Sequence, residues 1–99
     1  MNVRTQSLHF DADQKLINFI SKKVTKLETF FDNIIAADVI LRLEKNGKMQ
    51  DKVAEVRLNV PGGTLVARES NKTFEASVEF AVDAVRRQLI KYKEKQQGR

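Results

Sequence analysis

The chain contains no cysteine and no tryptophan, and its only histidine is His9. Without cysteine it can form neither a disulfide nor a thiolate metal site, and one histidine is too few for the usual zinc sites and nucleophile–base pairs. His9 falls beside an expected turn, where a lone histidine is usually a surface residue. Carboxylates from separate segments could still meet as an acid–base pair. We nevertheless expect a protein that is not an enzyme, with no catalytic residue, bound metal, cofactor or small-molecule substrate.

Long apolar runs are also missing from the sequence. No run approaches the roughly 18 residues of a membrane-spanning helix, and the N-terminal segment lacks the apolar block of a signal peptide. We therefore expect a cytoplasmic protein with no membrane partner. Its 99 residues are enough for one domain with one core.

The basic residues exceed the acidic ones by five, and the whole excess lies at one end of the chain. Residues 86–99 hold six basic residues and one acidic residue, whereas the preceding 85 residues hold 12 of each. A net charge of +5 alone would be an ordinary solubility charge. Because the excess positive charge lies in one segment, however, it creates a local field that attracts phosphate groups. The distribution favours contact with nucleic acid.

The same end of the chain predicts an amphipathic helix that begins after Thr73, its expected N-cap. Its apolar residues recur every three or four positions and fall within roughly 80° of arc. These stripe residues are Phe74, Val78, Val82, Val85, Leu89 and Tyr92. The basic residues that follow Val85 can bind phosphates, the arginines as forks and the lysines as point charges. They are Arg86, Arg87, Lys91, Lys93 and Lys95.

A first helix is expected from Ala12 to Phe31, with Asp11 as its N-cap. Its predicted buried stripe consists of Leu16, Ile20, Val24, Leu27 and Phe31. A row of lysines, Lys15, Lys22 and Lys26, falls on another face, and taken alone this row favours a solvated surface. Lys23 lies at the margin of the stripe, so its ammonium group has to extend past apolar neighbours to reach water.

Alternating apolar and polar residues between these helices predict three strands, at about 39–44, 54–60 and 65–70. Asn46-Gly47 signals a turn, but we expect the connection from Lys45 to Asp51 to be longer than a two-residue hairpin. A weaker pattern predicts a first strand over residues 2–10. The expected architecture is α+β, a two-layer β-α-β-β-β-α fold. A four-stranded sheet carries both helices on one face, as in a double-stranded-RNA-binding domain.

Phe80 interrupts the polar side of the closing helix. Helical spacing places it roughly opposite the apolar stripe, near Arg87 and Lys91. An aromatic ring in this position could stack on a nucleic-acid base or contact a protein partner. It could also fold over a sheet edge or be exposed without a partner, as single surface aromatics often are.

Two separated segments carry a family resemblance. They read ISKKVTKLETFFD in the first helix, and NVPGGTLVARESNKTFEASVEFAVDAVRRQLIKYKEK at the end of the chain. The matching residues are Lys23, Lys26, Leu27, Glu28, Phe31 and Asp32, then Leu65, Ala67, Ala76, Val78, Arg87, Gln88, Leu89, Lys91, Lys93 and Lys95. In this order they resemble the ribosome hibernation-promoting factors, the ribosome-associated translation inhibitor family.

This resemblance implies a domain that binds the small ribosomal subunit in the channel between head and body, where tRNA and mRNA lie. Occupying that channel blocks translation and stores ribosomes inactive in starvation or stationary phase. The rRNA contacts would come from Lys22, Lys23, Lys26, Arg86, Arg87, Lys91, Lys93 and Lys95. A generic double-stranded-RNA-binding protein remains the alternative, and a protein-interaction module that docks an acidic partner is a third hypothesis.

The sequence also departs from the family pattern. Thr73 and Glu75 replace an aspartate and a tyrosine, Phe74 replaces a methionine, and Ala84 stands where a lysine is common, so one rRNA contact is expected to be missing. Long members add a linker and a second domain that pairs two ribosomes. Because this chain ends at Arg99, we expect residues 1–99 to form a single ribosome-binding domain without that C-terminal dimerisation domain. A separate ribosome-dimerising partner and action on single ribosomes both stay open.

Overall fold

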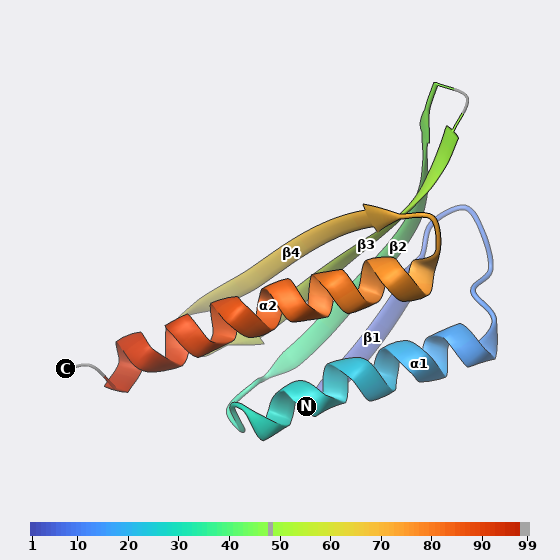
Figure 1. Ribbon diagram of the computed structural model, residues 1–99. Coiled ribbons are helices and arrows are strands. Elements are labelled where there is room, and N and C mark those ends of the chain that lie inside the picture. Colours follow the sequence, from blue (N-terminus) through green and yellow to red (C-terminus); the bar gives the residue numbers. More distant parts are fainter. Residues whose placement is uncertain (48, 98–99) are drawn as a thin grey trace.

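The computed structural model of the protein describes residues 1–47 and 49–97. Six elements and one short 3₁₀ turn, η1, follow one another along the chain (Figure 1). They are β1 (Asn2–Ser7), α1 (Gln14–Thr25), η1 (Lys26–Thr29), β2 (Ala36–Asn46), β3 (Met49–Val60), β4 (Gly63–Asn71) and α2 (Phe74–Gln97). The predicted β-α-β-β-β-α order is confirmed.

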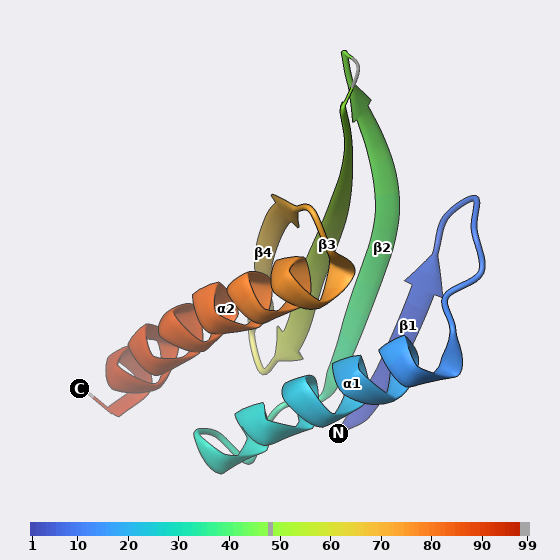
Figure 2. The same cartoon turned by 45° about the vertical axis from the view of Figure 1, so that its right-hand side comes forward.

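The four strands form one sheet in the order β1-β2-β3-β4. β1 pairs with β2 in parallel, through a crossover that contains α1, and the later pairs are antiparallel. Both helices cover the same face of this sheet, so the predicted two-layer architecture is confirmed (Figure 2). Because β1 and β4 point the same way and each helix runs back from the end of its strand, α1 and α2 run side by side in the same direction (Figure 1).

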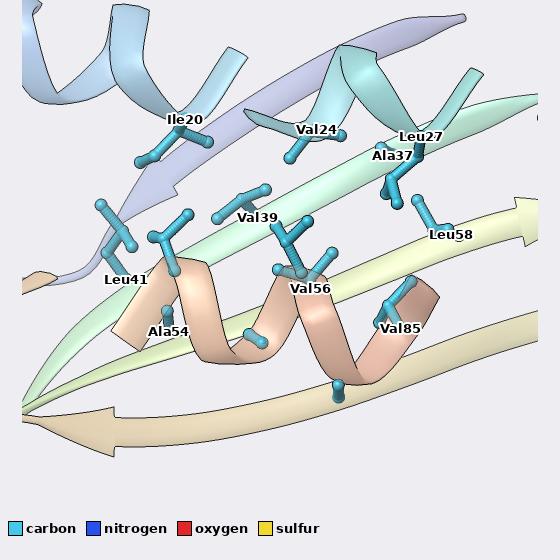
Figure 3. Close-up of a cluster of buried hydrophobic side chains, with 14 of the residues drawn as sticks. Ile20, Val24, Leu27, Ala37, Val39, Leu41, Ala54, Val56, Leu58 and Val85 are labelled. Atoms are coloured by element: carbon cyan, nitrogen blue, oxygen red, sulfur yellow. The ribbon is translucent and has the colours of Figure 1, made fainter. Parts of the chain in front are cut away.

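One hydrophobic core joins the helices to the sheet (Figure 3). Ile20 and Val24 of α1 and Val85 of α2 are fully buried against inward-facing side chains of β2 and β3. The inward-facing strand residues include Ala37, Val39, Leu41, Ala54, Val56 and Leu58. The predicted stripe residues of both helices are buried in this core, except Phe31 and Tyr92, which are half-buried and pack against it.

The last described turns of α2 are tied to the sheet by Tyr92. Its hydroxyl donates a hydrogen bond to the carbonyl oxygen of Pro61. Its ring packs edge-on against Phe31, with ring centroids 5.6 Å apart. The prediction that Tyr92 belongs to the core stripe is confirmed. No helix within the described part of the chain combines the length and apolar character needed to cross a membrane.

The predicted start of the first helix is wrong by two residues. The N-cap is Asp13, whose carboxylate accepts a hydrogen bond from the backbone N–H of Leu16 at 2.8 Å. The first strand also ends at Ser7, earlier than predicted, because the chain turns at His9, where φ is 68°. The connecting segment then places Phe10 on Phe74, with stacked rings 5.0 Å apart, so Asp11 lies in a loop.

The predicted end of the first helix is also too late. α1 ends at Thr25, and the chain tightens into η1 before Phe31, which lies outside any helix. Leu27 remains in the core because a short 3₁₀ turn can continue an α-helical stripe for a few residues.

The expected long connection between the second and third strands is also wrong. Asn46 pairs with Met49, so only two residues join β2 to β3. Gly47 adopts a φ of 69°, which glycine tolerates at no steric cost. The hairpin extends beyond the helices (Figure 1), and residues 43–45 and 50 are exposed, so no buried face imposes the alternation that predicts strands. Lys48 lies outside the described residues.

The observed N-cap, Asp13, and the predicted one, Asp11, can be distinguished by mutation. Asp13→Ala should lower the free energy of unfolding by about 1 kcal/mol, because the N–H of Leu16 loses its acceptor. Asp11→Ala removes the same charge two residues earlier and should change that free energy by less than about 0.5 kcal/mol. Urea denaturation followed by circular dichroism measures both. Equal losses in the two variants would contradict the cap at Asp13.

Candidate nucleic-acid interface

The parallel course of the two helices brings their basic ends to the same end of the molecule (Figure 1). Phe30, just after η1, is one of the residues that contact α2 there. The guanidinium carbon of Arg86 lies 5.5 Å from the centroid of the Phe30 ring. The ammonium group of Lys93 donates a hydrogen bond to the Phe30 carbonyl oxygen at 3.2 Å. Residues far apart in the sequence thus form one continuous surface.

Lys23 occupies the seam between α1 and α2. Its ammonium nitrogen lies 3.0 Å from a carboxylate oxygen of Glu79 and 5.6 Å from the centroid of the Phe19 ring. Its side chain is 35% exposed, so the prediction that the ammonium group extends past apolar neighbours to water is confirmed. Together with Glu79, Asp83 and Arg86, it lines a shallow groove of about 220 Å³. The groove holds charges of both signs.

The other lysines of the predicted site lie on the outer faces of the helices. Lys22 of α1 and Lys26 of η1 line one shallow depression together with Asn18 and Thr25. Lys91 and Lys95 are exposed on α2. Within residues 1–47 and 49–97, no ion pair holds any of these four lysines. Their positive charges are therefore available to a ligand.

Asp83 holds two of the predicted arginines and was not singled out by the sequence analysis. One carboxylate oxygen lies 2.9 Å from Arg86, and the other lies 3.0 Å from Arg87. The hydrogen bond from Arg86 lowers the pKa of the Asp83 carboxyl; partial desolvation opposes this, and the charges of both arginines lower it further. The spacing of three and four residues between carboxylate and guanidinium was the signal that could have revealed it.

The basic side chains also lie near the negative ends of the helix dipoles. Lys22 and Lys23 are in the last turn of α1, and Lys95 is in the last turn of α2. Such placement stabilises a helix by only about 0.3–1 kcal/mol per residue. Helix stability is thus a weak reason for eight basic residues to gather at one end of the helical layer.

The open face of the sheet has a different electrostatic character. There arginines pair with carboxylates, either between strands, as in the 3.0 Å contact between Arg4 of β1 and Asp38 of β2, or within one strand. The other pairs on this face are Arg57 with Glu55, Arg42 with Glu44, and Arg68 with Glu44. These opposite charges largely cancel, whereas Lys22, Lys26, Lys91 and Lys95 of the helical layer make no ion pair among the described residues.

Phe80 is exposed on α2, with 56% of its surface accessible. It lies one turn before Ala84 and two turns before Arg87, on the side of the helix opposite buried Val78 and Val82. The predicted outward direction of its ring is therefore confirmed. Ala84, the small residue at an expected lysine position, is half-buried and adds no charge to this surface.

The fold and this charge distribution define a two-layer α+β domain with one cationic helical face. The chain belongs to the family described as Sigma 54 modulation protein / S30EA ribosomal protein, whose model matches residues 3–97.

Curated relatives agree with this membership over nearly the whole chain. A ribosome hibernation promoting factor from Pseudomonas putida is 36% identical, covering 99% of this chain and 92% of the relative. Its counterpart from Azotobacter vinelandii is 33% identical, covering 97% and 86%. That from Escherichia coli K12 is 30% identical, covering 96% of each chain. The predicted resemblance to hibernation-promoting factors is confirmed.

Solved structures show the same fold. A ribosomal subunit interface protein from Coxiella burnetii superposes with a TM-score of 0.82 at 22% identity, covering 94% of this chain and 98% of that one. The N-terminal domain of Protein Y from Thermus thermophilus gives a TM-score of 0.80 at 25% identity, covering 93% and 99%.

The ion pairs of Asp83 with Arg86 and Arg87 predict how the Asp83 carboxyl group titrates. In the folded protein the pKa of the Asp83 carboxyl should lie below its ordinary value, and Arg86→Ala should raise it toward that value. Carboxyl chemical shifts followed by NMR through an acid titration measure both, and Lys95→Ala, three turns away, is the matched control. Because the folded pKa is lowered, the stability contributed by this group is present above the ordinary aspartate pKa and is lost as the pH falls through the folded value. An Asp83 pKa that Arg86→Ala leaves unchanged would contradict the pairing.

Proposed function

We propose that this protein is a non-enzymatic, cytoplasmic ribosome hibernation factor. It binds the small ribosomal subunit in the channel between head and body, where tRNA and mRNA lie. Occupying that channel blocks translation and stores ribosomes inactive during starvation. Residues 1–99 act in this as a single ribosome-binding domain.

The observation that carries the proposal is the joint cationic surface of α1 and α2. Two helix ends meet there through Phe30, while the opposite face of the sheet is charge-balanced. A one-sided positive surface suits a large RNA that is recognised by shape and phosphate positions instead of base sequence. The proposed rRNA-binding residues are Lys22, Lys23, Lys26, Arg86, Arg87, Lys91, Lys93 and Lys95.

These eight residues fall into two groups. Neighbouring protein groups hold Lys23, Arg86, Arg87 and Lys93. The other four, Lys22, Lys26, Lys91 and Lys95, make no ion pair in the described part of the chain. The four held residues present fixed donors to a rigid RNA, and the other four lysines adjust to nearby phosphates. Neutralising about six phosphates would give a log–log salt slope of about −4 to −5.

The names of the relatives favour a ribosomal target over duplex RNA in general. The curated relatives are named ribosome hibernation promoting factors, and one similar structure is titled a ribosomal subunit interface protein. A generic duplex-RNA-binding protein would bind isolated RNA duplexes nearly as tightly as it binds small subunits. Titrating both ligands at the same salt concentration separates the two hypotheses.

The proposal predicts co-sedimentation of the purified protein with small ribosomal subunits in a sucrose gradient. The double charge reversal Arg87→Glu/Lys91→Glu should abolish this, because both side chains point away from the core and each reversal replaces an attraction to phosphate by a repulsion. Circular dichroism should show an unchanged fold. Sedimentation of the folded double variant with small subunits would contradict the proposed contact surface.

A matched control reverses two lysines at the other end of the molecule. Lys45 lies in the projecting hairpin and Lys72 lies before the start of α2, and both are exposed. Lys45→Glu/Lys72→Glu changes the net charge by the same amount and should retain binding.

In starved-cell extract, protein in a ribosome-dimer peak would indicate a separate dimerising factor. Protein only at the top of the gradient at low salt would overturn the ribosomal assignment.

We further propose that Phe80 stacks on an unpaired rRNA base beside the phosphates that Arg87 binds. Phe80→Ala should then weaken binding to small subunits roughly tenfold, because one aromatic–base stack is lost. The salt slope should stay unchanged, whereas Arg87→Ala should reduce it by about one. Val66→Ala truncates an exposed apolar residue of the opposite face and serves as the control. Equal affinity of Phe80→Ala and the unsubstituted protein would rule out the stack.

A further inference from the structure

We infer that Asp83 is a positioning residue, which holds the guanidinium groups of Arg86 and Arg87 as one pair directed at phosphates of the bound RNA. This inference rests on the proposed function, because the arginine pair needs a phosphate ligand. It adds an acidic residue to a surface whose proposed contacts are all basic or aromatic.

The geometry allows one carboxylate to hold both arginines at the same time. Oδ1 of Asp83 accepts a hydrogen bond from Arg86 at 2.9 Å, and Oδ2 accepts one from Arg87 at 3.0 Å. Neither arginine has to leave for the other to bind. The ring of Phe30 lies on a further side of Arg86, 5.5 Å from its guanidinium carbon. Arg86 is thus held by two protein groups and Arg87 by one.

Both arginines keep donors for a ligand while they are held. The side chain of Arg86 is 40% exposed and that of Arg87 is 66% exposed. A guanidinium has five N–H donors, and Asp83 takes one from each arginine in the described contacts. The remaining N–H groups can donate paired hydrogen bonds to the oxygens of a phosphate.

Two physical effects of Asp83 on RNA binding have opposite signs. Its negative charge repels phosphates and competes with them for the guanidinium groups. Its hydrogen bonds restrict two long side chains before RNA arrives, which reduces the conformational entropy lost on binding. Because the signs differ, a change in affinity shows which effect is larger. Our inference is that the restriction outweighs the repulsion.

Glu94 provides the matched control. It lies eleven residues after Asp83, which is about three helical turns, so both acids project from the same side of α2. Glu94 is exposed, and among the residues that the structure describes it makes no ion pair. The change in affinity when the Glu94 carboxylate is removed therefore measures only the repulsion between that charge and phosphates.

The experiment measures the affinity of Asp83→Ala and Glu94→Ala for purified small ribosomal subunits at one salt concentration. Glu94→Ala should bind roughly twofold more tightly, since a charge that repels phosphate is lost. Asp83→Ala should bind roughly five- to tenfold more weakly, since both arginines lose their restraint. Asp83→Glu, which keeps the carboxylate, should bind more tightly than Asp83→Ala.

A double-mutant cycle distinguishes positioning from a structural role. In the background Arg86→Ala/Arg87→Ala, Asp83→Ala should no longer weaken binding and should act as Glu94→Ala does. Thermal unfolding should be nearly unchanged by Asp83→Ala, because alanine is a good helix former and exposed ion pairs contribute little. If Asp83→Ala still weakens binding in the variant that lacks Arg86 and Arg87, the inference is wrong.

The remaining outcomes separate this inference from the proposed function. If the unsubstituted protein binds small subunits and Asp83→Ala tightens binding as Glu94→Ala does, the carboxylate acts only by repulsion and the inference is wrong while the function stands. If the unsubstituted protein does not bind small subunits, the proposed function fails and the positioning role fails with it.

Discussion

The packing of two apolar helix stripes on one face of the sheet is the constraint on which the cationic surface depends. Ile20 and Val24 from α1 and Val85 and Leu89 from α2 are fully buried in the core that the helices form with the sheet. Burying the stripes fixes the rotation of each helix about its axis, and that rotation decides which side chains face outward. The parallel pairing of β1 with β2 fixes the direction of α1. The basic ends of both helices therefore lie together, even though their positive charges repel one another.

Features that repeat along the sequence could be predicted, and features that depend on a single residue or on contacts between segments could not. The helix stripes and the alternation in β3 were predictable because burial acts on every turn and every second strand residue. The helix cap was not, since Asp11 and Asp13 have the same chemistry and only the turn at His9 selects between them. The β2–β3 hairpin was missed because its outer part has no buried face to impose a pattern.

The candidate site divides in the same way. Its basic residues could be named from helical spacing and from the family resemblance. The contact of Lys23 with Glu79 could not, since it requires the distance between two helices that are separate in the sequence. The paired arginines at Asp83 are an intermediate case, because their spacing within one helix is visible in the sequence. Only the structure shows that both side chains reach the same carboxylate.

The hydrogen bond from Tyr92 to Pro61 has a kinetic consequence. It anchors the last described turns of α2 to the turn between β3 and β4, and the edge-on contact with Phe31 joins them to the end of η1. A surface anchored in this way does not have to fold when it meets its target. The rate of encounter is then set by diffusion and by the long-range attraction between the helical face and phosphate charge, and it falls as salt screens that attraction.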